Sequence, residues 1–590
     1  PPAGADRAQL AGAKIGPHVV RALMARGWIE RGVRQASAAS GNELAHATAI
    51  AADAAPTPNP AQANAVTAIH AARDRFQPFL LDGVTGSGKT EVYLQAIADC
   101  LARDKQALVV VPEIGLTPQL VARFAQRLGC APTLLHSARS ETERLRAWLA
   151  ARSGEAQVII GTRSAAWIPL ARPGLFIVDE EHDASLKQQD GFRYSARDLL
   201  VWRAHRDGVP IVLGSATPSL ESLHNAQQGR YRHLSLPERA GSASAPRLHV
   251  LDLRNQPLDE GLSPALLAHM RSHLGRDGQV LLFLNRRGFA PTLLCHACGW
   301  TAECRRCDAH LTLHQRHQQL RCHHCGSQQH VPPQCPDCGC TDLRPLGAGT
   351  ERVERALARH FPELPHVRID RDSTRRKGQL QSLLDDAASG RARILLGTQM
   401  LAKGHHFAGV TLVGILEADQ GLFSADFRAG ERLAQQIIQV AGRAGRAKRP
   451  GEVLIQTHHP DHPLLQQLVR AGYPAFAREA LTERRAAGLP PFSSLALLRA
   501  EAADARTPDR FLCEARDTAN PTLSRGLEFW GPVPSPMERR AGRFRAQLLL
   551  VARDRKRLHA LLAEWVPCLG ELKSSRKVRW SLDVDPVDLF

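Results

Sequence analysis

One eight-residue stretch, GVTGSGKT at residues 83–90, constrains the fold of this 590-residue chain more than any other. It follows the apolar run FLLD and precedes the helical pattern EVYLQAIADCLA. A glycine-rich turn between a strand and a helix that ends in Gly-Lys-Thr is typical of a phosphate-binding loop, or P-loop. Its glycines let backbone N–H groups approach phosphates, and the helix N-terminus adds a positive end. The stretch therefore predicts a parallel α/β sheet that binds a nucleotide.

Two side chains of the P-loop have specific expected roles. We expect Lys89 to neutralise the β- and γ-phosphate oxygens and Thr90 to coordinate Mg²⁺. The other P-loop residues that we expect to contact the nucleotide are Gly83, Thr85, Gly86, Ser87 and Gly88. The predicted cofactor is ATP with Mg²⁺.

A second motif, FIVDEEHD at residues 176–183, is a buried-strand pattern that ends in acids. Uncompensated carboxylates at the end of a buried strand are costly, so they indicate a metal. We expect Asp179 to hold Mg²⁺, directly or through water, and Glu180 to orient and deprotonate the attacking water. A solvated acidic turn is the alternative, and the intact P-loop disfavours it.

Short apolar runs alternate with amphipathic helices in two parts of the chain, which predicts two parallel α/β lobes. The strands expected in the first lobe are PFLLDG (78–83), ALVVVPE (107–113), VIIGT (158–162), LFIVDEE (175–181) and PIVLGSAT (210–217). Those expected in the second are QVLLFLN (279–285), RILLGT (393–398), TLVGILEAD (411–419) and GEVLIQT (451–457).

The rest of the chain divides around these two lobes. The predicted units are a winged-helix-like DNA-binding segment (1–50), a Pro/Ala-rich linker (51–61), the first lobe (62–240), the second lobe in two parts (241–293 and 344–465), a cysteine-rich insertion (294–343) and a C-terminal α+β domain (466–590). A capping pair of helices is the alternative for the first unit.

The stretch QVAGRAGR (439–446) supplies Arg443 and Arg446 from the second lobe. Phosphoryl transfer needs cations on the γ-phosphate, and an arginine finger can raise the rate by about 10³–10⁵. A surface loop is the alternative, because Gly-Arg pairs are common. One lobe with a P-loop and acids and another with arginines favour ATP bound between the lobes.

Eight of the thirteen cysteines form four CxxC pairs in the insertion. They are Cys295, Cys298, Cys304, Cys307, Cys322, Cys325, Cys335 and Cys338. In a reducing compartment such clustering indicates metal rather than disulfides. Eight thiolates suit two closed tetrahedral Zn²⁺ sites, which have a structural role because no position is left for water.

The spacing of the CxxC pairs leaves several alternatives open. It permits nested or sequential pairing, Cys340 could displace Cys338, and a histidine (His296, His323 or His324) could replace a thiolate. An iron–sulfur cluster is a further alternative.

The formal net charge of +18 indicates a polyanionic partner such as nucleic acid. No apolar run approaches the ~20 residues that cross a bilayer, and no signal peptide is visible. We expect a cytoplasmic protein.

Seven motifs in order resemble those of superfamily 2 helicases. They are GVTGSGKT, VPEIGLTPQL (111–120), GTRSA (161–165), DEEH (179–182), GSATPS (214–219), GTQMLAKGHHF (397–407) and QVAGRAGR. Four further stretches narrow the resemblance to the PriA family of primosomal DNA helicases, which restart stalled replication forks. They are FLNRRGFAPTLLCHACGW (283–300), IDRDS (369–373), FSADFRAGER (423–432) and SLDVDP (581–586).

This resemblance covers the chain from about residue 5 and implies two RecA-like lobes. It implies an ATP-dependent helicase that moves 3′ to 5′, unwinds forked DNA and initiates primosome assembly. A translocase that does not unwind, and a zinc-stabilised assembly factor with an idle ATPase, are the alternatives. Members carry an additional N-terminal domain that captures a nascent 3′ end, so we expect this sequence to be a piece of a longer protein.

The resemblance also assigns expected roles to single residues. Gln62 falls where the family recognises adenine, and Lys403 and Gly404 fall at the lobe interface. Ser215 to Thr217 link the ATP state to the DNA track. The implied zinc pairing is nested, 295/298/335/338 and 304/307/322/325, with the zinc module acting as a wedge between DNA strands.

Residues 182–200 resemble the aromatic-rich loop by which the family senses single-stranded DNA. In this loop Phe192 and Tyr194 can stack on bases, with core aromatics as the alternative. The cations expected near the DNA backbone are Lys187, Arg193 and Arg197. Two departures from the family are Leu186, where an aromatic is usual, and Ser195, where histidine is usual.

The resemblance further implies protein partners. Arg543 and Gln547 match a pocket for the acidic C-terminal tail of the single-strand DNA-binding protein, with a strand edge guarded by cations as the alternative. Other implied partners are the primosome proteins PriB and DnaT, through them the replicative helicase, and the nucleoid of a bacterial cytoplasm.

Overall fold

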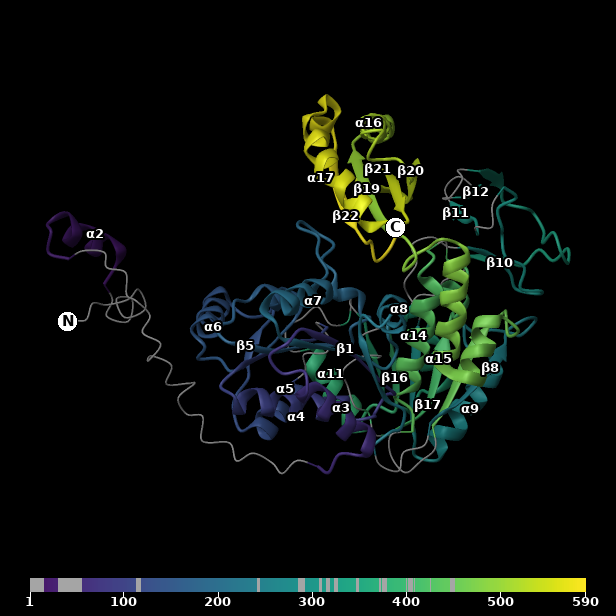
Figure 1. Cartoon of the computed structure of the whole chain (residues 1–590). Coiled ribbons are helices and arrows are strands. Elements are labelled where there is room, and N and C mark those ends of the chain that lie inside the picture. Colours follow the sequence, from purple (N-terminus) through teal and green to yellow (C-terminus); the bar gives the residue numbers. More distant parts are fainter. Residues whose placement is uncertain are drawn as a thin grey trace.

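The computed structural model describes most of the chain (Figure 1). The described residues are 15–29, 56–112, 118–240, 245–284, 292–306, 310–314, 319–322, 327–345, 350–370, 373, 379–398, 401, 407, 409–424, 426–445 and 451–589. Seven residues named above lie outside them, namely Cys307, His323, His324, Cys325, Lys403, Gly404 and Arg446.

Lobe 1 is a seven-stranded parallel sheet in the order β3-β4-β2-β5-β6-β1-β7. Its strands are β1 (Gln77–Gly83), β2 (Gln106–Val110), β3 (Thr133–Leu135), β4 (Val158–Gly161), β5 (Pro173–Asp179), β6 (Pro210–Ser215) and β7 (Arg232–Leu236). Its helices are α3 (Pro60–His70), α4 (Lys89–Ala102), α5 (Pro118–Leu128), α6 (Glu141–Ser153), α7 (Ala196–Asp207) and α8 (Leu220–Gln227), with short 3₁₀ helices η3 (Arg163–Trp167) and η4 (Ala184–Leu186). All five expected strands are confirmed. The apolar runs predicted them correctly because parallel strands that are covered on both faces are continuously apolar.

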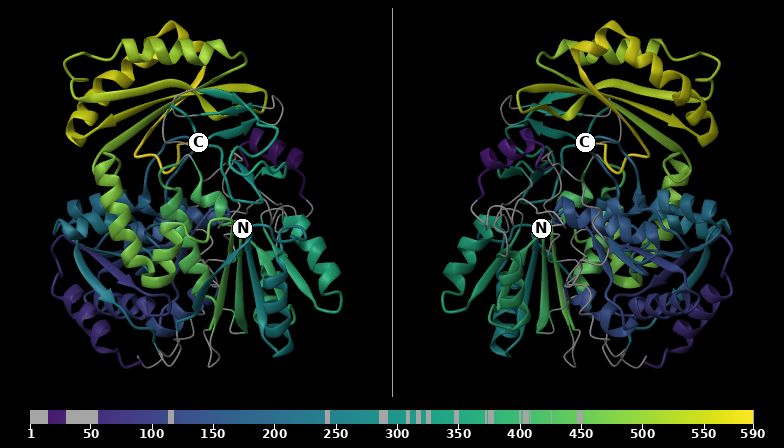
Figure 2. Two further views of the ribbon diagram at one scale, coloured as in Figure 1. Left: turned by 90° about the vertical axis from the view of Figure 1, so that its right-hand side faces the viewer. Right: turned by 90° about the vertical axis from the view of Figure 1, so that its left-hand side faces the viewer.

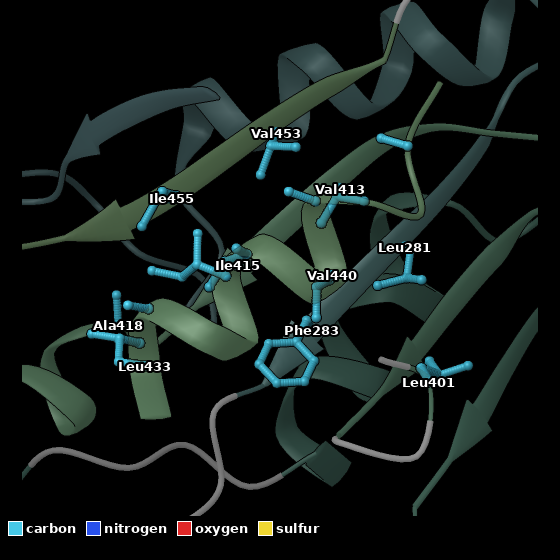
Figure 3. Close-up of a cluster of buried hydrophobic side chains, with 14 of the residues drawn as sticks. Leu281, Phe283, Leu401, Val413, Ile415, Ala418, Leu433, Val440, Val453 and Ile455 are labelled. Carbon is cyan, nitrogen blue, oxygen red and sulfur yellow. The ribbon is translucent and has the colours of Figure 1, made fainter. Parts of the chain in front are cut away.

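Lobe 2 is a six-stranded parallel sheet in the order β15-β16-β9-β17-β18-β8. Its strands are β8 (Arg247–Asp252), β9 (Gln279–Leu284), β15 (His366–Ile369), β16 (Ile394–Gly397), β17 (Val410–Leu416) and β18 (Glu452–Thr457). Its helices are α9 (Pro264–Gly275), α10 (Thr350–His360), α11 (Gln379–Ala388), α13 (Asp419–Leu422), α14 (Ala429–Ala441) and α15 (Pro463–Ala486). Figure 3 shows Phe283 and Ile415 of the sheet facing Leu433 and Val440 of α14.

The cysteine-rich insertion leaves lobe 2 after β9 and returns before α10. It contains two small antiparallel sheets. Their strands are β10 (Leu293–Cys295), β11 (Thr312–His314), β12 (Gln319–Arg321), β13 (Gln328–His330) and β14 (Leu343–Pro345). Its described apolar cluster is small, so the insertion has little core of its own beyond what a metal supplies.

The C-terminal domain is a four-stranded antiparallel sheet in the order β20-β21-β19-β22 with helices on one face. Its elements are β19 (Ser494–Ala502), α16 (Arg506–Asp517), β20 (Leu527–Arg540), β21 (Arg543–Ala552), α17 (Arg555–Glu571), η6 (Lys573–Lys577) and β22 (Arg579–Val584). Figures 1 and 2 show it above both lobes, following the long helix α15. A cavity of about 400 Å³ lies where the three units meet, and its wall includes Arg197, Arg428 and Arg555.

The N-terminal segment contributes one described helix, α2 (Pro17–Ala25), which has no buried residue. It lies within the stretch expected to form a helix, a turn and a second helix, and the rest of that stretch lies outside the described residues, so the winged-helix-like pair stays a prediction. None of the described helices is long and apolar enough to span a membrane.

Candidate nucleotide, zinc and DNA sites

The P-loop connects β1 to α4, as the sequence predicts. Gly86 and Gly88 have φ angles of +84° and +85°, a left-handed conformation that favours glycine. A Cβ atom on Gly83 would lie 2.5 Å from the Ser87 Oγ, so the turn also needs glycine there. Lys89 Nζ donates a hydrogen bond to the Gly83 carbonyl at 2.7 Å. The ammonium thus lies across the loop, beside the N-terminus of α4, where a phosphate would bind.

The expected acids lie at the end of β5, beside the P-loop. Tyr93 of α4 donates a hydrogen bond to Asp179 Oδ1 at 2.9 Å. Burial and the Glu180 carboxylate raise the pKa of Asp179 to about 6, and Lys89 opposes that shift. The Asp179 carboxylate, whose charge Glu180 disfavours, is an oxygen ligand that fits Mg²⁺.

Glu180 has an unusual backbone. Its φ angle is +47°, which is strained for a residue with a side chain. Its Oε2 atom is buried and makes no hydrogen bond in the described structure, with His182 Nδ1 3.7 Å away. The carboxylate is therefore available to accept a hydrogen bond from water, as a general base requires.

Lobe 2 contacts both motifs through the end of α14. Gln439 lies 2.6 Å from His182 Nε2, and His182 Nδ1 lies 2.7 Å from the Ser215 hydroxyl. A Cβ atom on Gly442 would fall 2.6 Å from Thr85 Cγ2, so the backbone after α14 approaches the P-loop closely. Arg443, the next residue, is buried. The structure thus brings lobe 2 to the P-loop, whereas Arg446 is not among the described residues.

Gln62 lies against the P-loop at the start of α3. Its Oε1 accepts a hydrogen bond from the Asn59 backbone N–H at 2.9 Å, which completes a capping box. Its Nε2 donates to the Ser87 carbonyl at 2.8 Å. The side chain is near the nucleotide site, and both ends of its amide have protein partners in this structure.

Four cysteines meet as a metal site. The Sγ atoms of Cys295, Cys298, Cys335 and Cys338 all lie within 4.8 Å of one another. The Cys295–Cys338 and Cys298–Cys335 sulfurs are 3.7 and 3.6 Å apart. A Zn²⁺ ion with Zn–S bonds of about 2.3 Å needs tetrahedral sulfurs about 3.8 Å apart. Cys295 and Cys298 therefore share a site that fits zinc with Cys335 and Cys338, which is the nested arrangement. The sequential arrangement, in which Cys295 and Cys298 share a metal with the next CxxC pair along the chain, is excluded.

The other cysteine alternatives are partly resolved. Cys340 lies outside the four-sulfur group, and its sulfur accepts a hydrogen bond from the Asp342 backbone N–H at 3.4 Å. Cys304 and Cys322 belong to the small apolar cluster of the insertion. Their expected partners lie outside the described residues, so the inner site remains a prediction.

The outer zinc knuckle is fixed to lobe 2 by a chain of buried side chains that the sequence did not reveal. His296 Nδ1 lies 2.9 Å from His458 Nε2, and His458 Nδ1 lies 2.8 Å from Asp419 Oδ2. On the far side of the insertion, Arg321 forms a 3.1 Å ion pair with Glu538 of the C-terminal domain. The insertion thus contacts two units rather than projecting from one.

Of the two aromatic residues expected to contact DNA, Phe192 is exposed on lobe 1, whereas Tyr194 is half-buried and packs against the lobe 1 core. The Phe192 ring is 74% exposed and stacks against Tyr194, with their centroids 6.1 Å apart. Leu186 is buried in the lobe 1 core, so it offers no surface to a base. Ser195 caps α7 by accepting a hydrogen bond from the Asp198 N–H.

The three cations expected near DNA have protein partners instead. Lys187 is buried and pairs with Asp583 of β22 at 3.0 Å. Arg193 lies 3.8 Å from the same carboxylate, and Arg197 pairs with Glu181 at 3.0 Å. In this structure these cations join lobe 1 to the C-terminal domain or stabilise lobe 1 itself, and their contact with DNA remains a prediction.

The expected partner pocket lies on β21. Gln547 is buried, and its Oε1 makes no hydrogen bond in the described structure. Arg543 is half-buried, with its Nε 4.0 Å from the Glu501 carboxylate. Because β21 lies between β20 and β19, the alternative of a guarded sheet edge is wrong.

The chain matches known protein families along most of its length. Residues 59–226 match the DEAD/DEAH box helicase family and residues 348–448 the helicase conserved C-terminal domain. Residues 304–329 match the PriA DNA helicase Cys-rich region domain, and residues 485–587 the primosomal protein N C-terminal domain.

Three curated relatives extend this similarity. The replication restart protein PriA of Haemophilus influenzae is 52% identical over 514 residues, which cover 87% of this chain and 70% of that protein. Those of Bacillus subtilis and Synechocystis sp. are 38% and 42% identical over 87% and 85% of this chain. The chain spans 64% and 62% of the length of these two relatives. The helicase lobes, the cysteine-rich module and this identity together show that the chain belongs to the PriA family of replication restart proteins.

Proposed function

We propose that this chain is an ATP-driven DNA helicase that moves 3′ to 5′, recognises forked DNA and initiates primosome assembly at stalled forks. Membership of the PriA family and the two helicase domains support the ATP-driven helicase activity. One observation carries the proposal, namely the approach of lobe 2 to the P-loop at Gly442 and Thr85. A nucleotide bound there touches both lobes, so its hydrolysis changes how they meet.

Each residue of the site has a role in this proposal. Lys89 binds the β- and γ-phosphates, and Thr90 and Asp179 hold Mg²⁺, which neutralises phosphate charge when bound. Glu180 orients the attacking water and accepts its proton. The cations that stabilise charge on the γ-phosphate come from lobe 2, at Arg443 and Arg446.

Unwinding assays on tailed duplexes test the direction. The proposal predicts ATP-dependent unwinding of a fork or of a duplex with a 3′ tail, and little unwinding of a duplex with only a 5′ tail. Translocation without strand separation would support the non-unwinding alternative, and fork binding without ATP turnover would support the idle-ATPase alternative. Because the positive charge should contact phosphates, fork affinity should fall steeply with salt.

We further propose two structural zinc ions, one at the outer site and one at 304/307/322/325. Elemental analysis should then find two zinc ions per chain, and Cys298→Ser and Cys304→Ser should each remove one. If the module separates strands, either substitution lowers unwinding much more than ATP hydrolysis. Equal losses of both activities would make the module only a support for the fold.

The C-terminal domain is proposed to bind the acidic tail of the single-strand DNA-binding protein at Arg543 and Gln547. The buried Gln547 oxygen, which has no hydrogen-bond partner in the described structure, supports a ligand that donates an N–H there, and the half-buried Arg543 guanidinium supplies a positive charge on the same strand. Contacts with PriB and DnaT, recruitment of the replicative helicase and a place at the bacterial nucleoid belong to the same proposal. A tail peptide that binds the native chain and Arg543→Ala equally would contradict the assigned pocket.

A further inference from the structure

Three aromatic rings, not two, contact one another at the surface of lobe 1, with Phe192 and Trp167 exposed and Tyr194 half-buried. The third is Trp167, whose centroid lies 5.2 Å from that of Tyr194 and 6.0 Å from that of Phe192. Trp167 belongs to η3, outside the aromatic-rich loop, and is 51% exposed. Large apolar side chains that are both exposed and in mutual contact mark a binding surface, unlike isolated exposed residues.

We propose that Trp167 is a base-stacking residue that binds an unpaired base of single-stranded DNA together with Phe192 and Tyr194. This inference rests on the proposed DNA-dependent function and adds a residue to its DNA site. Aromatic faces stack on every base, so the cluster would bind single strands without sequence preference.

The cluster is held as one unit before any ligand binds. Arg163 Nη1, from η3, donates hydrogen bonds to the carbonyls of Ser185 and Lys187 at 3.0 and 3.1 Å. Tyr194 Oη donates to the Arg163 carbonyl at 3.4 Å. These contacts join η3 to the aromatic-rich loop, so the position of Trp167 relative to Phe192 is set in advance. A preformed surface loses less conformational entropy when it binds a ligand.

The surroundings of the rings favour bases over phosphates as the bound group. The nearby cations Lys187, Arg193 and Arg197 all pair with protein carboxylates. The exposed large apolar side chains of this surface are Trp167 and Phe192.

A matched pair of tryptophan substitutions tests the inference. Trp202 on α7 is 56% exposed on the same lobe, and its described ring contact is with the Arg206 guanidinium at 5.3 Å. Affinity for a labelled oligo-dT, measured by fluorescence anisotropy, should fall about five- to a hundredfold in Trp167→Ala and stay unchanged in Trp202→Ala. Trp167→Phe, which keeps a ring, should retain most of the affinity.

An abasic oligonucleotide of the same length separates stacking from damage to the fold. On abasic DNA, Trp167→Ala should bind as well as the native chain, because no base is present to stack. A defect of equal size on both oligonucleotides, or no defect on oligo-dT, would overturn the inference. If Phe192→Ala alone weakens binding, the DNA site stands without Trp167. If the native chain does not bind oligo-dT at all, the proposed function itself fails.

Discussion

The two lobes contribute to the candidate ATP site in different ways. In lobe 1, Lys89, Asp179 and Tyr93 come from one sheet and the helix after its P-loop, and they already contact or influence one another. Among the described residues of lobe 2, Gln439 and Gly442 at the end of α14 reach across to this site. In the proposed mechanism, nucleotide binding is therefore a local property of lobe 1, whereas hydrolysis depends on how the lobes meet.

The contact between the lobes has supports of its own, away from the P-loop. Glu221 of lobe 1 pairs with Arg428 of lobe 2 at 2.5 Å. Glu431 of α14 accepts a hydrogen bond from the Leu220 N–H at 3.0 Å and pairs with Arg484 at 2.7 Å. These contacts set the position of α14, so they bear on hydrolysis without touching the nucleotide site.

The largest expected effect comes from removing the lobe 1 cation. Lys89→Ala should reduce DNA-stimulated ATP hydrolysis to background, because it removes the ammonium that binds the β- and γ-phosphates. Fork binding should persist, since Lys89 lies at the nucleotide site. Turnover and fork affinity are measured side by side, with Lys556→Ala on the exposed face of α17 as the control. Retained turnover would refute the assigned site.

A lobe 2 substitution separates hydrolysis from nucleotide binding. Gly442→Val adds a side chain that would meet Thr85 at 2.6–2.7 Å and so forces the lobes apart. Because a displacement of about 1 Å can cost a hundredfold in rate, hydrolysis should fall by about that factor while nucleotide affinity changes little. Gly275→Ala is the control, since a Cβ there meets nothing within 4 Å. Equal losses of nucleotide affinity and of ATP hydrolysis would contradict the idea that lobe 1 binds the nucleotide while the contact with lobe 2 controls its hydrolysis.

The ion pairs between the lobes predict a dependence on pH. Although burial opposes it, the guanidinium groups of Arg428 and Arg484 lower the pKa of Glu221 from 4.5 to about 2. A depressed carboxyl pKa stabilises the fold above its ordinary value, and that stability is lost as the pH falls from about 4.5 through 2. Glu221→Gln should therefore lower stability by about 1–3 kcal/mol at neutral pH.

Thermal unfolding of the native chain and of Glu221→Gln measures this effect. The difference between the two should shrink steadily as the pH is lowered below about 4.5. A difference that is independent of pH would mean that the Glu221 charge does not hold the lobes together.

The smallest expected effect is at Tyr93. Tyr93→Phe removes only the hydroxyl that donates to Asp179, and one such hydrogen bond contributes about 0.5–1.5 kcal/mol. The Mg²⁺ concentration for half-maximal hydrolysis should change about two- to tenfold, with less effect on the rate at saturating Mg²⁺. An unchanged Mg²⁺ requirement would mean that the Tyr93 hydroxyl does not affect how Asp179 binds the metal.

The sequence predicted the interior of both sheets because central parallel strands are apolar on both faces. It missed β3, β7, β8 and β15, which are short or lie at sheet edges. An edge strand such as Arg232–Leu236 is largely exposed, so its sequence lacks a continuous apolar run. The missed strands are recognisable only once the fold places them beside a neighbouring strand, because their own residues show no long apolar run.

The candidate sites show the same limit. Motif spacing predicted Lys89 and Asp179, because a P-loop and a strand-end acid are local patterns. Spacing alone left the pairing of Cys295 open, and the sulfur positions resolved it for the outer site. No local pattern could reveal that Lys187 pairs with Asp583, because the partner comes from the far end of the chain.

The most direct test of the shared ATP site is a crystal structure with a non-hydrolysable ATP analogue, Mg²⁺ and single-stranded DNA. The account predicts that the triphosphate lies in the P-loop, with Mg²⁺ at Asp179 and the Arg443 guanidinium within hydrogen-bond distance of the γ-phosphate. A nucleotide held by lobe 1 alone, with Arg443 turned away from it, would contradict the account.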